Sequence, residues 1–226
     1  MSAFKMAALC LAACSVSGCG VVREARIAVP SDVAASTERL ELRGMGGGTR
    51  GGFELAGERG SFARSAERLS MPIVRNRTGG GSFEYGALAG RCGFREGELH
   101  AGSVSVTTRP FAYRCSFHRD GRPIDAELIL EESYNSPTAM LSKRERRGTL
   151  FFEGQRIELR SLHRDQGGGL PTAAPLGYAF DVDGRQIGAI DLNGTSKTLY
   201  LPRGGAREAV LAASLALSVL WDPAEV

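Results

Sequence analysis

The chain has 226 residues, enough for one sizeable domain or two small ones. Hydrophobic residues make up 42% of it and charged residues 23%, which is ordinary for a folded globular protein. The net charge of +3 is too small to indicate a nucleic-acid partner.

The first residues have the pattern of a secretory signal. Residues 1–5, MSAFK, carry one positive charge and precede an apolar stretch over residues 6–18. That stretch is too short for a membrane-spanning helix, which needs about 20 apolar residues. It ends in VSGC, residues 16–19, which resembles the lipobox of bacterial lipoproteins: an aliphatic residue, two small residues and a cysteine. The resemblance implies that residues 1–18 are removed and that Cys19 carries lipid.

Two alternatives to this interpretation stay open. A second match, LAAC at residues 11–14, would make Cys14 the lipidated residue, although it leaves an apolar stretch of only about eight residues. The other alternative is an ordinary signal peptide with incidental cysteines. If the lipobox is correct, acyl chains anchor the protein in the membrane of the cell envelope. Gly20, in place of an aspartate, favours the periplasm-facing outer membrane over the inner membrane.

Two cysteines remain for the folded part of the chain, Cys92 and Cys115. An even pair in an oxidising compartment predicts one disulfide, and two buried thiols are the alternative. A metal site is disfavoured because neither cysteine has a CxxC partner or a suitably spaced histidine pair. No metal and no cofactor are predicted.

The mature chain divides into two parts. Residues 19–36 contain small residues, one proline and scattered charges, which is typical of a lipidated tether. Residues 37–226 consist mainly of short alternating runs broken by glycine, and they predict a single β-rich domain. Within it, residues 167–180 predict a long loop that enters a strand, and long ordered loops often carry function.

Four turn signals indicate antiparallel hairpins in the second half. They are Asp120-Gly121, Glu153-Gly154, Asp183-Gly184 and Asn193-Gly194, each between alternating runs. Such pairs favour tight turns because both central residues need positive φ.

The last segment breaks this pattern. Residues 206–221 predict a helix, since alanine and leucine dominate and Asp222-Pro223 ends the run. From Ala209 to Trp221 there is no charge, so we expect the helix to be buried on all sides. Its two serines can bond to carbonyls one turn back. The predicted fold is therefore mainly β, an antiparallel barrel or sandwich of about 10–12 strands around one apolar C-terminal helix.

This order of elements resembles the tubby-like barrel, the architecture of the tubby C-terminal domain, the phospholipid scramblases and the LURP-one-related proteins. The resemblance covers roughly residues 37–226 and rests on the order of strands and helix. It implies a closed barrel that encloses the C-terminal helix, and it transfers no functional residue.

Catalytic signatures are missing from the sequence. There is no HExxH and no GxSxG. His118 lies near Asp120 and His163 near Asp165, so either histidine could join a distant serine. Solvated strand ends explain both pairs more simply, and no catalytic residue is predicted.

The densest basic cluster is KRERR, with Lys143, Arg144, Arg146 and Arg147. It is either a solvated loop or a contact for anionic lipid headgroups. Together these features predict a membrane-anchored envelope lipoprotein that binds lipid or protein without catalysis. The alternatives are a structural or assembly factor of the outer membrane, and a hydrolase whose active site is assembled from separate strands.

Overall fold

The computed structural model describes residues 26–70, 73–101, 104–133, 145–168 and 171–221. These residues form twelve strands and two helices. The helices are α1 (Ser31–Ser36) and α2 (Arg207–Ser218). The strands are β1 (Thr37–Leu42), β2 (Arg50–Leu55), β3 (Glu58–Ser70), β4 (Val74–Tyr85), β5 (Leu88–Ala101), β6 (Val104–Arg119), β7 (Arg122–Glu132), β8 (Arg146–Phe152), β9 (Gln155–Leu162), β10 (Gly177–Val182), β11 (Arg185–Asp191) and β12 (Lys197–Pro202).

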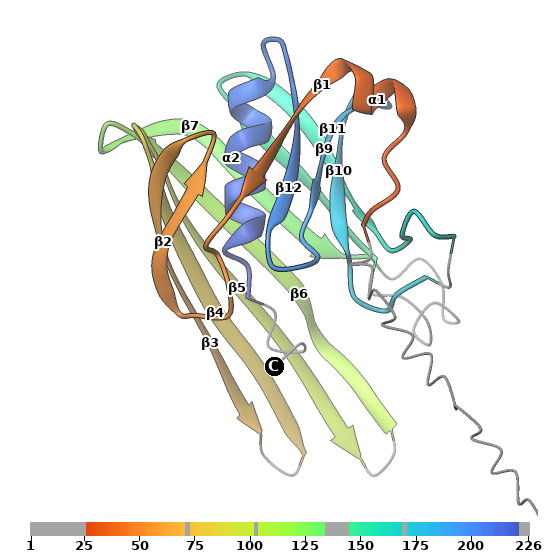
Figure 1. Cartoon of the computed structure of the whole chain (residues 1–226). Helices are drawn as coiled ribbons and strands as arrows, with labels where there is room; N and C mark the ends of the chain where they lie inside the picture. The colour runs from red at the N-terminus through yellow and green to blue at the C-terminus, as the bar shows by residue number, and fades with distance from the viewer. Residues whose placement is uncertain (1–25, 71–72, 102–103, 134–144, 169–170, 222–226) are drawn as a thin grey trace, which may run out of the picture.

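The strands form one antiparallel sheet that curls into a nearly closed barrel (Figure 1). From β2 to β12 each strand pairs with its neighbours in the chain, and β1 pairs with β12. The seam between β1 and β2 carries one bridge, in which Arg43 and Glu54 exchange two backbone hydrogen bonds of 2.9 Å. The predicted fold class is therefore confirmed, in its barrel form.

Tight turns connect the hairpins as their sequences predict. Both residues have positive φ in Asp120-Gly121, Glu153-Gly154 and Asp183-Gly184. At Asn193-Gly194 only the glycine does, and the connection from β11 to β12 is a longer loop over residues 192–196.

Helix α2 fills the inside of the barrel, between β12 and the long strands β4 and β5 (Figure 1). Its residues 212–218 are all buried, which confirms the prediction of an apolar helix covered on every side. The Tyr113 hydroxyl donates to the carbonyl of Ala216 over 2.5 Å, and burial raises the pKa of that hydroxyl well above its usual value. Ser218 Oγ donates to the carbonyl of Ser214 over 2.8 Å, one turn back.

Small residues on β4 let the helix approach the wall. A Cβ on Gly81 would lie 2.8 Å from the carbonyl oxygen of Val219 and 2.9 Å from its Cγ2. Because real Cβ atoms do not approach heavy atoms this closely, the end of α2 can take this position only beside a glycine.

The predicted disulfide is confirmed. Cys92 on β5 and Cys115 on β6 are directly opposite in the register, with Cα atoms 4.0 Å apart. Their sulfurs are bonded across a sequence separation of 23 residues.

The predicted tether is wrong from residue 26 onward. Ile27 is completely buried and Val33 nearly so, and Ile27 forms a β-bridge with Asp165. These apolar residues pack the segment against the barrel. The scattered charges and the one proline in this part of the sequence did not indicate such packing. The remaining part, residues 19–25, lies outside the described residues, as do Cys14 and Cys19.

Strands β3 to β6 are longer than the rest and project past the barrel on one side (Figure 1). The pairing of β3 with β2 ends at Ala63, and the pairing of β6 with β7 ends at Ala112. Residues 64–70 and 104–111 therefore extend on the order of 25 Å beyond their neighbours, at about 3.3 Å per residue.

Replacing Gly81 with alanine should destabilise the fold. The added methyl group would force the end of α2 away from β4, and overpacking of this kind costs about 1–3 kcal/mol. Denaturant unfolding measures this free energy. Gly204→Ala is the control, because nothing lies within 4 Å of its added Cβ. Equal stability of the two variants would contradict the close packing.

Candidate functional site

A pocket of about 730 Å³ lies at the end of the barrel where α2 ends. We call it the mouth pocket. The last residues of α2 and two loops, residues 172–176 and 192–197, contribute to its lining. Its apolar side chains include Leu176, Leu192, Leu217, Leu220 and Trp221. Three basic side chains, Arg64, Arg146 and Lys197, also line it.

Arg64 reaches the pocket from β3. Its guanidinium carbon lies 5.2 Å from the centre of the Phe62 ring and 5.2 Å from that of Trp221. The same group donates to the carbonyls of Gly46 and Gly48, which lie in the loop between β1 and β2. Burial lowers the pKa of Arg64, although the side chain remains a cation at any physiological pH.

Arg146 begins β8 and is 3% exposed. Its guanidinium carbon lies 4.0 Å from the centre of the Phe111 ring. A cation on an aromatic face is stabilised by the ring quadrupole, most strongly where water is excluded. Arg146 is thus a buried cation in the wall of the pocket, with its guanidinium against the Phe111 ring.

A serine and a histidine are held behind this wall. Ser161 Oγ accepts a hydrogen bond from the backbone N–H of Arg146 and lies 2.9 Å from His163 Nε2. His163 Nδ1 lies 2.9 Å from the carbonyl oxygen of Thr172. Since a carbonyl only accepts, Nδ1 carries a proton and donates to Thr172. The chain of bonds joins Arg146 to Thr172, and both of these residues line the pocket.

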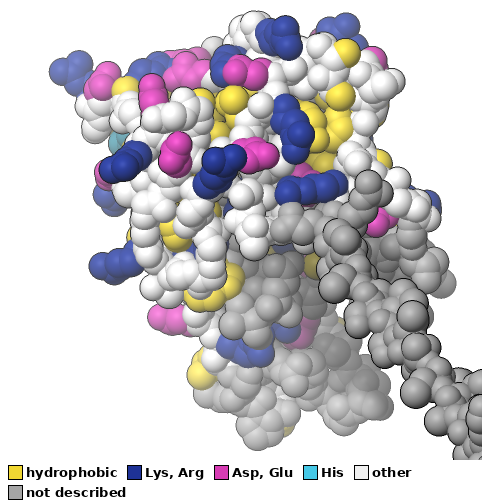
Figure 2. Space-filling view, viewed as in Figure 1, with side chains coloured by type: hydrophobic (Ala, Val, Ile, Leu, Met, Phe, Trp, Pro, Cys, Tyr) yellow, Lys and Arg dark blue, Asp and Glu magenta, His cyan; other side chains and the backbone are white. Residues whose placement is uncertain are grey.

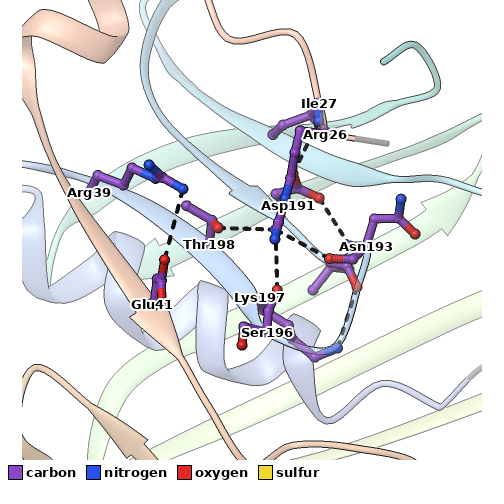
Figure 3. A network of polar contacts seen from close by, with 10 residues as sticks. Arg26, Ile27, Arg39, Glu41, Asp191, Asn193, Ser196, Lys197 and Thr198 are labelled. Carbon is purple, nitrogen blue, oxygen red and sulfur yellow. Dashed lines mark hydrogen bonds and ion pairs between the residues drawn. The ribbon is translucent and has the colours of Figure 1, made fainter. Parts of the chain in front are cut away.

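The loop between β11 and β12 forms another side of the pocket, and a buried carboxylate fixes it. Asp191 is 1% exposed and accepts from the backbone N–H groups of Ile27 and Asn193, over 3.1 and 3.0 Å. Figure 3 shows Arg26 reaching across this loop. Its Nη1 donates to the carbonyl of Ser196 over 3.2 Å and to the Thr198 hydroxyl over 3.3 Å. The first described residues are thereby bound to the mouth of the barrel.

The structure separates the predicted basic cluster. Arg146 is buried at the mouth pocket, whereas the next residue, Arg147, is exposed on β8 and lies opposite Glu131 in the register. Successive strand residues point to opposite faces, so the two cannot contact one surface together. Both arginines lie on β8 and not in a loop, so they do not form one basic surface. Contact of the cluster with anionic lipid stays a prediction, and Lys143 and Arg144 lie outside the described residues.

Sequence reasoning missed Arg64, Lys197 and Trp221. They lie far apart in the chain, and no spacing relates them. One sequence signal did point to the pocket: the predicted long loop over residues 167–180 supplies Thr172, Ala174, Pro175 and Leu176 to its lining.

Other surfaces are weaker candidates. A hollow of about 780 Å³ follows the wall of β3–β6, but glycines and short side chains such as Ser65, Ser82 and Ala89 line much of it. On the face shown in Figure 2, basic and acidic side chains are interspersed over the barrel. Among the described residues no three His, Cys, Asp or Glu side chains are grouped to hold a metal ion. No helix in those parts of the chain is long and apolar enough to cross a membrane.

Comparison with protein-family models, curated proteins and solved structures finds no match to this chain. The candidate site therefore rests on its own geometry.

Asp191→Asn should loosen both the loop and the first described residues. An amide has one acceptor oxygen, so it cannot serve both backbone N–H groups, and a buried donor left unsatisfied costs about 1–3 kcal/mol. We expect lower stability in denaturant and faster trypsin cleavage after Arg26.

Asp183→Asn is the matched control, since asparagine tolerates the positive φ of that exposed turn. If Asp191→Asn were as stable and as resistant to trypsin as this control, the buried carboxylate would not hold the segment.

Proposed function

We propose that this chain is a lipid-anchored protein of the bacterial cell envelope that binds an anionic amphiphile in the mouth pocket. The ligand class is an acyl chain with a carboxylate or phosphate head. One observation carries the proposal: basic and apolar side chains from distant parts of the chain converge on one pocket, with Arg64 stacked on Trp221.

Each part of such a ligand has a counterpart in the pocket. Leu176, Leu217 and Leu220 offer apolar surface for an acyl chain. Lys197 is partly exposed and offers positive charge for the head, beside the buried charge of Arg146, and charge-assisted hydrogen bonds are about twice as strong as neutral ones. A volume of about 730 Å³ lies within the usual range for small-ligand sites.

The position of the pocket limits the ligand further. Because α2 occupies the barrel interior, the acyl chain would lie at the mouth and not along the barrel axis. A free fatty acid and a phospholipid share the same chemistry here, and they differ in mass.

Anchoring through Cys19 is part of the proposal and rests on the lipobox resemblance. Location at the outer membrane rests on Gly20 alone. Likeness to the tubby-like barrel stays a prediction, because it rests on the order of strands and helix.

Ser161 and His163 are the one observation that favours the hydrolase alternative. Their 2.9 Å contact matches a nucleophile and its base. However, Ser161 is not among the residues that line the mouth pocket, and its oxygen already accepts from Arg146 N–H. His163 Nδ1 faces a carbonyl where a triad has a carboxylate. We therefore assign the pair to holding the wall, and expect no labelling of Ser161 by a fluorophosphonate probe; labelling that disappears in Ser161→Ala would restore the hydrolase.

Native mass spectrometry of the full chain, extracted from its own membranes, tests the binding proposal. We expect an acylated chain that carries one non-covalent anionic lipid or fatty acid, whose mass identifies the source. Lys197→Gln should weaken the affinity for the ligand at least about tenfold and so lower the bound fraction, since a hydrogen bond to a charged group contributes about 1.5–3 kcal/mol.

Arg185→Gln is the control for this experiment. It removes the same charge from the exposed first residue of β11, which is not among the residues that line the pocket, and should leave the adduct unchanged. A chain with no adduct, or an adduct equally sensitive to both substitutions, would contradict the proposed site.

A further inference from the structure

Exposed apolar side chains are concentrated at the end of the projecting strands. In the described part of the chain five large hydrophobic side chains are exposed, and four of them lie there: Leu69, Ile73, Leu99 and Val106, at 53, 63, 41 and 54%. The fifth is Phe151, on β8. We call the parts of β3–β6 beyond the last paired residues of β2 and β7 the projection.

Register places three of these side chains on one face of the projection. Leu99 on β5 is directly opposite Val106 on β6. Leu69 on β3 lies on the same face, because it pairs with Asn76 and Asn76 pairs with Gly97, two residues from Leu99. Water-exposed leucine and valine in such a group are unusual on a soluble surface and indicate contact with another apolar phase.

Two arginines, Arg95 and Arg109, lie nearer the barrel than the apolar side chains of the projection. Arg95 lies four residues before Leu99 on the same strand, which is about 13 Å nearer the barrel. Arg109 pairs with Gly97 on the same face, and both arginines are exposed. An apolar end with Arg109 about 7 Å and Arg95 about 13 Å behind it matches the interface of an anionic bilayer, where long arginine side chains reach the phosphates.

The inner face of the projection holds it together. Arg77 Nη1 lies 3.0 Å from Glu96 Oε2, and both side chains are at least nine-tenths buried. The pair joins the neighbouring strands β4 and β5, where the two residues are directly opposite, and removing one partner would leave a buried charge uncompensated.

Arg26, the first described residue, lies at the same end of the barrel. Arg26 is bound to the loop between β11 and β12, at the mouth of the barrel, and the projection extends past that mouth. From Cys19 to Arg26 the chain can span at most about 25 Å. The projection extends on the order of 25 Å beyond the neighbouring strands. An acylated Cys19 and the end of the projection can therefore reach one membrane plane.

We infer that the projection inserts its apolar end into a phospholipid bilayer at the boundary between headgroups and acyl chains, with Arg109 and Arg95 on the phosphate side of it. The barrel then stands on the membrane at two points, the acyl anchor and the projection, and the mouth pocket faces the bilayer between them. The inference uses the proposed anchor only to fix which end of the barrel faces the membrane.

Tryptophan depth measurements on the full chain test this placement. Because the native chain has one tryptophan, a Trp221→Phe background allows a single reporter at Leu99→Trp or, as a second position, Val106→Trp. The protein is reconstituted into vesicles of zwitterionic and anionic phospholipid that carry brominated acyl chains. We expect a blue-shifted emission that the brominated chains quench and aqueous iodide does not.

Phe151→Trp in the same background is the matched control. Its side chain is exposed at 46% on the barrel wall, and we expect quenching by iodide alone. If the Leu99 and Val106 reporters were quenched by iodide alone, the projection would stand in water and the inference would fail. Quenching by neither agent would mean that protein covers them, a second copy or a partner, and would overturn the inference as well.

Vesicle flotation and the mass of the reconstituted chain separate this inference from the proposed anchor. A chain that does not float with the vesicles would contradict both. Lipid quenching of a floating chain whose mass lacks acyl groups would support the projection and contradict acylation of Cys19.

Discussion

The structure depends on the need to cover an uncharged helix on all sides. A helix with one apolar stripe needs only one packed face, whereas α2 buries residues 212–218 completely. A sheet covers one face of a helix, so complete coverage requires a sheet that returns on itself. The order of strands achieves this with hairpins alone, and a single bridge between Arg43 and Glu54 joins the two ends of the sheet. Glycines such as Gly81 then set how closely the wall approaches the helix.

The covered helix also determines where a ligand can bind. With the interior occupied, the accessible apolar surface lies where α2 ends, at Leu217, Leu220 and Trp221. The loops at this end, residues 172–176 and 192–197, line the pocket with polar backbone groups and with the charge of Lys197. The first described residues are part of the same arrangement, because Asp191 accepts from Ile27 and from the pocket loop. The pocket and the first described residues therefore lie together at one end of the barrel.

Local chemistry made much of the fold predictable. Asp-Gly pairs identify turns because few residues adopt positive φ, and an uncharged alanine-leucine run identifies a buried helix. The pairing of Cys92 with Cys115 followed from their number and compartment. The mouth pocket was not predictable, since Arg64, Arg146 and Lys197 meet only after the barrel closes. The cluster around Arg146 looked like a surface loop because sequence alone does not show that an arginine can be buried against Phe111. Likewise, the sequence shows β3–β6 only as runs of alternating residues. It does not show that these strands continue past the points where β2 and β7 stop, which leaves their ends exposed.

The place of α2 at the end of the chain has a consequence for how this protein is made. Tyr113 bonds to Ala216, and β1 pairs with β12, so the native contacts join the two ends of the sequence. During synthesis from the amino terminus, hairpins such as β5–β6 can form as soon as both of their strands have been made. The apolar inner faces of these strands have nothing to pack against until α2, the last element of the chain, has been made. High contact order of this kind slows folding and leaves apolar strands exposed for a time. Completion of the barrel is thus controlled by its final helix, and a chain shortened by that one element would keep most of its strands and lose its core.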